Sequence, residues 1–128
     1  FNSANGFLPH NYETDSVVYT GTHDNDTTVG WYRTLSEPIR DVIRRYYGIS
    51  GEDIAWDLIR SASASRARYC IFPLQDLLSL DSDARMNTPA TIGGNWSWRF
   101  SPQTDILNPL RRLRDLTDLY GRLPWAPK

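Results

Sequence analysis

The sequence predicts a helix-rich α/β fold, because two short segments of strand character alternate with segments of helical character. Residues 16–20 (SVVYT) and 69–73 (YCIFP) are short, apolar and contain β-branched or aromatic residues, which is typical of strands. Strands that alternate with helices lie parallel in one sheet. The adjacent Val17 and Val18 favour a sheet covered on both faces. A two-stranded sheet leaves both edges unpaired, so we expect the 128-residue chain to be part of a larger protein.

Four helices are expected around these strands. Ser36 can cap a helix N-terminus, Pro38 fits the first turn of that helix, and Gly48 supplies a stop. The other boundaries follow from helical spacing of apolar residues. The expected helices span about residues 28–35, 36–48, 50–65 and 104–121, the last with Leu107, Leu110, Leu113 and either Leu116 or Leu119 on one stripe. The long loop at residues 79–103 carries aromatic residues, which favours function over disorder.

Composition and charge exclude several classes of function. The net charge is −1 and no basic patch interleaves with aromatic residues, so nucleic acid is not expected as a partner. No apolar run approaches the roughly 20 residues that a membrane span needs.

Cys70 is the single cysteine and lies in an apolar run, so we expect a buried thiol and a reducing compartment such as the cytoplasm. The chain begins at Phe1 without a signal-peptide pattern, so truncation or processing is expected.

A polar segment, residues 21–28 (GTHDNDTT), directly follows the first expected strand. Active sites of barrels and open α/β sheets lie at the carboxyl ends of strands. His23 beside Asp24, with Asp26 two residues on, suits acid–base chemistry, binding of sugar hydroxyls or metal binding. The same acidic residues could instead cap the following helix, and Asp26 fits a cap better than a catalyst. These residues alone leave the alternatives open.

Five separated motifs occur in order along the chain: residues 7–12 (FLPHNY), 17–32 (VVYTGTHDNDTTVGWY), 73–78 (PLQDLL), 84–89 (ARMNTP) and 94–99 (GNWSWR). Over nearly the whole chain they resemble the 4-alpha-glucanotransferase (amylomaltase) family of the alpha-amylase clan. Several motifs in one order are far more specific than a single His-Asp pair. The resemblance implies that residues 1–128 are the C-terminal portion of a (β/α)8 TIM barrel, namely its last two strands with their helices.

The resemblance also implies an activity. The family transfers α-1,4-glucan segments between maltooligosaccharides by a retaining double displacement, with no metal or cofactor. Its aspartate nucleophile and glutamate acid/base lie on earlier strands and no segment here matches them, so the isolated chain is expected to be inactive. Asp24 matches a third carboxylate, which would bind hydroxyls of the distorted sugar ring, while His23 would donate to a neighbouring hydroxyl. The expected partners are the glucan substrate and the rest of the barrel, in the cytoplasm or in a plant plastid.

The long loop is expected to line the same cleft. Asn87 is a candidate contact near the cleaved bond, although a turn role is also open. Trp96 and Trp98 alternate along the chain, so one should face sugar and the other the core, and we take Trp96 as the candidate sugar contact. Asp76, after the second strand, is interpreted as a cap of a short turn more readily than as a ligand contact. His10 is expected to be structural, with hydrogen bonds inside its own loop.

Two other classes of function compete with this interpretation. The His23–Asp24 pair could belong to an HD-type metal phosphohydrolase, but such a site gathers several histidines and this chain has two. Exposed tryptophans could belong to a carbohydrate-binding module without catalysis. Those modules are mostly β-sandwiches, whereas this sequence predicts many helices. We therefore expect neither a metal site nor a binding module.

Overall fold

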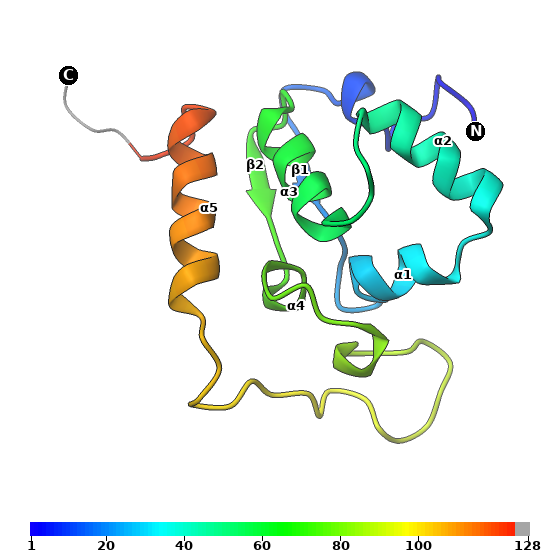
Figure 1. Cartoon of the computed structure of the whole chain (residues 1–128), viewed down its shortest axis with the longest axis vertical. Coiled ribbons are helices and arrows are strands. Elements are labelled where there is room, and N and C mark those ends of the chain that lie inside the picture. The colour runs from blue at the N-terminus through cyan, green and yellow to red at the C-terminus, as the bar shows by residue number, and fades with distance from the viewer. Residues whose placement is uncertain (125–128) are drawn as a thin grey trace.

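A two-stranded parallel sheet forms the centre of the computed structural model, which describes residues 1–124 (Figure 1). β1 (Val17–Tyr19) pairs with β2 (Tyr69–Ile71), with Val18 opposite Cys70. The 3-10 turn η1 precedes β1, three helices connect the strands, and α4, the 3-10 turn η2 and α5 follow β2. The bounds are η1 (Pro9–Asn11), α1 (Thr28–Thr34), α2 (Glu37–Tyr47), α3 (Ile54–Ala64), α4 (Leu74–Leu77), η2 (Ser82–Ala84) and α5 (Leu107–Leu119). The prediction of a helix-rich α/β chain with parallel strands is confirmed.

The helices are arranged around the sheet with α3 near the middle. Figure 1 shows α5 and α2 at opposite sides of the molecule, with α3 and the strands between them. Residues 85–106 contain no helix or strand and run along the end of the molecule where α4 and η2 lie (Figure 1). No helix within residues 1–124 has the length and apolar character that crossing a membrane requires.

The helix ends follow from local sequence, with three departures from expectation, one of which is that α3 begins at Ile54 and not near residue 50. Gly48 ends α2 in the left-handed conformation, at φ 66°, as its position predicts. Ser36 occupies the N-cap position of α2, but its side chain makes no capping hydrogen bond. The last helix begins at residue 107 and not at 104, because the side chain of Asp105 accepts hydrogen bonds from the backbone amides of Leu107 and Asn108. This local turn delays the start of α5.

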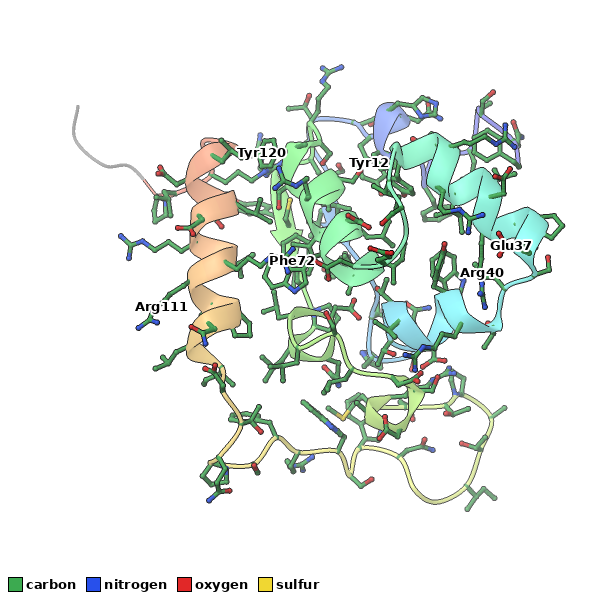
Figure 2. All side chains as sticks on the ribbon, viewed as in Figure 1. Tyr12, Glu37, Arg40, Phe72, Arg111 and Tyr120 are labelled. Atoms are coloured by element: carbon green, nitrogen blue, oxygen red, sulfur yellow. The ribbon has the colours of Figure 1, made fainter. Side chains whose placement is uncertain are left out.

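The core lies on both sides of α3. One cluster joins α3 to α4 and α5 and contains the buried residues Trp56, Ile59, Leu77 and Leu116. Phe72 and Tyr120 pack against this cluster, and Figure 2 shows them between α5 and the rest of the molecule, Phe72 just after β2 and Tyr120 at the end of α5. A second cluster joins the sheet to α3 through Val18, Ala62 and Ala67. Of the expected leucine stripe on α5, Leu116 is buried, whereas Leu107, Leu110 and Leu119 are exposed.

One face of the sheet is open to solvent, so the prediction of a sheet covered on both faces is wrong for the described chain. Val18 points into the core, but Val17 and Tyr19 point the other way, because successive side chains alternate across a strand. Tyr69 and Ile71 lie beside them on β2, and all four outward side chains are between 44% and 59% exposed. The physical reason is that every described helix that packs on the sheet covers the same face.

The C-terminal segment after α5 is tied to the end of α3. Arg122 donates from Nε to the carbonyl of Ser63 at 2.6 Å and from Nη2 to that of Ser65 at 2.7 Å. These carbonyls are left without partners where a helix ends.

Cys70 is half-buried. Its thiol donates to the carbonyl of Ala62, and burial raises the pKa of that thiol. The expectation of a buried thiol is therefore met in part.

Asp57 on α3 provides a pH-dependent test of the fold. Burial and the nearby Asp53 raise its pKa, and one of its carboxylate oxygens is buried without a hydrogen-bond partner among residues 1–124. A raised folded-state pKa means that ionised Asp57 opposes folding above that pKa, and the effect disappears as pH falls through it towards the unfolded value. We expect Asp57→Asn to raise the melting temperature at pH 7 and to lose this advantage at pH 3.

The control is Asp115→Asn, because Asp115 is exposed on α5. Thermal unfolding of both variants and the wild type at the two pH values measures the difference. A melting temperature for Asp57→Asn that is unchanged or lower at pH 7 would contradict the expectation.

Candidate functional site

An open pocket of about 460 Å³ lies beyond the carboxyl ends of both strands. Its walls come from the segment after β1, the segment after β2 and the long loop. His23, Asp26, Asp76, Arg85 and Trp96 are among its lining residues. The position matches the end of the sheet at which the sequence predicts a site. Polar groups from three distant segments therefore converge on one pocket.

Asp76 holds both ends of the polar segment that follows β1. Its carboxylate is 1% exposed and accepts hydrogen bonds from the hydroxyl of Thr20 at 2.6 Å and the hydroxyl of Thr28 at 2.8 Å. It also accepts the backbone amide of Thr28 at 2.8 Å. Thr20 and Thr28 bracket residues 21–27, so one buried carboxylate fixes where the loop begins and ends. The interpretation of Asp76 as a cap of its own turn is wrong, because its acceptors face β1 and α1.

Asp26 links the start of α1 to η2. Its carboxylate accepts the hydroxyl of Ser82 at 2.7 Å and the backbone amide of Thr27 at 2.8 Å. The cap of α1 is Thr27, whose hydroxyl accepts the amide of Gly30 at 3.1 Å, so the interpretation of Asp26 as the cap is wrong. Gly30 is required there, because an added Cβ would lie 2.2 Å from the hydroxyl of Ser82. Asp26 therefore has a structural role.

A second contact fixes η2 on the same helix. Arg33 on α1 forms an ion pair with Asp81, the residue that caps η2 by accepting the amide of Ser82. This backbone hydrogen bond, followed by the Arg33 charge, lowers the pKa of Asp81. The start of the long loop is thus attached to α1 at two places.

His23, Asp24 and Asn87 lie together at the edge of the pocket. The side-chain amide of Asn87 donates to Oδ1 of Asp24 at 2.7 Å, and Nε2 of His23 lies 3.3 Å from the same oxygen. The backbone amide of Asn87 donates to the carbonyl of His23 at 3.1 Å. The side chains of His23 and Asp24 are 55% and 50% exposed. His23 lines the pocket, whereas Asp24 and Asn87 stand beside it.

The indole of Trp96 packs against the imidazole of His23. The two ring centroids are 4.9 Å apart, and 54% of Trp96 remains exposed. Its backbone has φ 60°, a left-handed conformation that is strained for a bulky residue, and its amide donates to the carbonyl of Met86 at 2.7 Å. Trp98 is half-buried, as expected if only one of the two tryptophans faces the pocket. The exposed indole of Trp96 therefore lies against His23 in spite of a strained backbone.

Arg85 was not singled out by sequence reasoning, although it lies in the motif at residues 84–89. Its guanidinium donates to the carbonyl of Asp24 at 2.7 Å and to the carbonyl of Asn87 at 2.8 Å. Nothing in the local spacing predicts these bonds, because Asp24 and Arg85 are far apart in the chain. The motif resemblance was the only available signal.

The remaining candidates have structural partners. His10 contacts the hydroxyl of Tyr46 at 2.6 Å and the carbonyl of Ser3 at 2.8 Å. Its structural role is consistent with expectation, but one partner comes from α2 and not from its own loop. Within residues 1–124, no three side chains of His, Cys, Asp or Glu come together in a way that could hold a metal ion. The described residues thus offer no ligand set for a metal-dependent site.

Comparisons with known proteins connect this arrangement to a family. The profile described as 4-alpha-glucanotransferase (glycoside hydrolase family 77) matches residues 1–105. The chain is 51% identical over 123 residues to the chloroplastic/amyloplastic 4-alpha-glucanotransferase of Arabidopsis thaliana and 53% identical over 122 residues to the 4-alpha-glucanotransferase of Synechocystis. These alignments cover 93% and 92% of this chain but 21% and 24% of the relatives, so the chain spans less than a quarter of their length.

A solved structure gives the same picture. The amylomaltase from Streptococcus agalactiae, in complex with acarbose, superposes on this chain with a TM-score of 0.86 at 34% sequence identity. The match covers 94% of this chain and 24% of the amylomaltase. The fold of the chain therefore corresponds to part of a larger protein's fold.

Replacing Asp76 tests its role in holding the polar segment. Asp76→Ala leaves two hydroxyls and one amide without their buried acceptor, so we expect the free energy of unfolding to fall by about 3 kcal/mol. Asp83→Ala is the matched control, because Asp83 is exposed in η2, and its effect should stay within about 0.5 kcal/mol. Urea denaturation measures both. Equal, small losses for the two variants would show that Asp76 does not hold the segment.

Proposed function

The chain belongs to the 4-alpha-glucanotransferase family, and on that premise we propose that it forms part of the glucan cleft of an enzyme that transfers α-1,4-glucan segments. The proposed substrates are maltooligosaccharides, and the proposed reaction is a retaining double displacement. The observation that carries the proposal is the hydrogen bond between Asn87 and Asp24, which joins residues from separate motifs beside the pocket. A turn role for Asn87 alone would not require this contact.

Asp24 is proposed to bind ring hydroxyls of the glucose at the cleaved bond. A carboxylate offers about four acceptor positions, and Asn87 occupies one of them. Within residues 1–124, no protein group donates to the second oxygen, and the side chain is half exposed. Cleavage passes through an oxocarbenium-like ring, and hydrogen bonds that strengthen as charge develops lower the barrier. Asp24 therefore has free acceptors in a place that a sugar can reach.

His23 and Trp96 supply complementary surfaces. The Trp96 indole offers an apolar face, which suits the C–H face of a pyranose ring. His23 lies between this indole and Asp24, where a ring nitrogen can donate to a neighbouring hydroxyl. Acarbose in the Streptococcus agalactiae amylomaltase supports a ligand of this chemical type for the present chain.

The rest of the cleft is proposed to come from other strands of a (β/α)8 barrel, in which β1 and β2 are the last two strands. Two features support this. The outward side chains of β1 and β2 are apolar and half exposed, which suits a face that further elements cover. The relatives are also about four to five times longer than the matched region. The nucleophile and the acid/base would then lie on earlier strands.

The proposed location is the cytoplasm, or a plastid if the protein comes from a plant, as in Arabidopsis.

The two competing functions gain no specific support. The described residues form no metal cluster of the kind that an HD-type phosphohydrolase needs. The helix-rich fold differs from the β-sandwich expected of a carbohydrate-binding module. Glucan transfer is therefore the function that the site supports best.

Replacing Asp24 in the complete enzyme tests its proposed role. Asp24→Asn keeps the shape of the side chain and its bond to Asn87 can be remade, but the charge is lost. We expect kcat for maltotriose disproportionation to fall by at least about a hundredfold, with the melting temperature unchanged. Asp115→Asn on α5 is the control. Turnover at the wild-type rate in Asp24→Asn would remove Asp24 from the mechanism.

The isolated chain tests where the other catalytic carboxylates lie. The 128-residue chain alone is expected to produce no glucose and no longer maltodextrins from maltotriose, because the proposed nucleophile and acid/base lie outside it. Chromatography of the products, with the complete enzyme as positive control, measures this. Disproportionation by the isolated chain would show that its own residues suffice.

A further inference from the structure

Arg85 makes a two-pronged contact that joins two separate loops. Its Nη2 donates to the backbone carbonyl of Asp24 at 2.7 Å, and its Nε donates to the backbone carbonyl of Asn87 at 2.8 Å. A guanidinium is planar and presents its N–H groups in a fixed fork, so two simultaneous bonds set both the distance and the orientation between the acceptors. Arg85 therefore fixes the two backbones relative to each other.

The two backbones that Arg85 holds are those whose side chains meet. Asn87 donates its side-chain amide to Asp24 at 2.7 Å and its backbone amide to the carbonyl of His23 at 3.1 Å. Arg85 thus closes a ring of hydrogen bonds that runs from the segment after β1 to the long loop and back. The position of the Asp24 carboxylate is therefore set by this ring and also by the hydrogen bonds that Asp76 accepts at both ends of residues 21–27.

The ring adds to the other contacts that hold the long loop, which are those of Ser82 with Asp26, of Asp81 with Arg33 and of Trp96 with Met86. Residues 85–106 contain no helix or strand. The bonds from Asn87 and from Arg85 to Asp24 are both exposed, and one exposed hydrogen bond contributes little net stability in water, whereas the bond from Arg85 to the carbonyl of Asn87 is partly buried. A hydrogen bond with an ionised donor or acceptor is roughly twice as strong as one between neutral groups, which applies to both bonds of Arg85 and to the bond from Asn87 to the Asp24 carboxylate. Arg85 is the charged member of the ring that comes from the long loop.

We propose that Arg85 is a positioning residue, whose guanidinium keeps Asn87 on Asp24 and thereby aims the Asp24 carboxylate at the sugar. The proposal rests on the role proposed above for Asp24. It assigns Arg85 no contact with the substrate. A misplacement of about 1 Å at such a site can lower the rate by roughly a hundredfold, so loss of the fork should affect turnover far more than substrate binding.

The first test is a double-mutant cycle in the complete enzyme. Arg85→Met should lower kcat at least about tenfold while KM changes less than about threefold. If Arg85 acts through Asn87, adding Arg85→Met to Asn87→Ala should lower kcat by less than about twofold further. The control is Arg111→Met, because Arg111 points away from the body of the molecule on α5 (Figure 2), and it should keep wild-type kinetics.

Three results would overturn the proposal. Wild-type kcat in Arg85→Met would show that the fork is not needed, and multiplicative losses in the double variant would show that Arg85 acts independently of Asn87, as a direct sugar contact would. If Arg85→Met fails to fold, the same cycle with Arg85→Lys decides, because lysine keeps the charge but not the fork. Lysine restoring full kcat would also contradict the proposal. A loss in Asp24→Asn without a loss in Arg85→Met would overturn only the Arg85 proposal, whereas wild-type turnover in Asp24→Asn would overturn the proposed function.

The second test needs no activity. Hydrogen exchange of the Asn87 backbone amide, which bonds to His23, should become at least about tenfold faster in Arg85→Met, because local opening of the long loop becomes easier. Exchange of the Thr28 amide, which Asp76 accepts, is the internal control and should stay unchanged. Unchanged exchange at Asn87 would contradict the positioning role, and equal acceleration at both amides would indicate general destabilisation instead.

Discussion

The Asp76 carboxylate is the constraint on which the site depends. It lies on α4, is buried, and accepts three hydrogen bonds, two from Thr28 at the start of α1 and one from Thr20 just after β1. A buried carboxylate is costly unless its acceptors are used, so these donors and Asp76 stabilise one another. Because the two threonines bracket residues 21–27, the segment that carries His23 and Asp24 leaves the sheet and enters α1 at fixed points. The exposed residues of the site are therefore supported by a buried one.

The second half of the site is held by polar and aromatic contacts more than by burial, and it contains a strained residue. The long loop is attached to α1 through η2, to Asp24 through Arg85 and Asn87, and to His23 through Trp96. The left-handed backbone of Trp96 costs free energy that a glycine would not cost. Strain of this kind persists where the surrounding structure enforces it, and here it presents an indole to the pocket. The loop thus keeps a strained residue beside the pocket at some expense of stability.

Local sequence predicted the elements, and long-range contacts account for what it missed. The two strands, the stop at Gly48 and the approximate helix ranges follow from residue types and spacing, which act over a few residues. His23 and Asp24 are adjacent in the sequence, whereas the proximity of Asn87 to Asp24 could be anticipated only from the order of the motifs. The partners of Asp76 and Arg85 could not, because each bond joins residues that the fold, not the spacing, brings together. The expected cover on the second face of the sheet failed because the described helices pack on one face only.

The central claim is that Asp24, held by this framework, binds a sugar ring. The most direct measurement is a structure of the complete enzyme with an uncleavable α-1,4-linked oligosaccharide. The account predicts the second carboxylate oxygen of Asp24 within hydrogen-bond distance, about 3 Å, of ring hydroxyls, and Trp96 against the same or the adjacent sugar. An oligosaccharide bound elsewhere, with the Asp24 carboxylate facing only Asn87 and solvent, would contradict it.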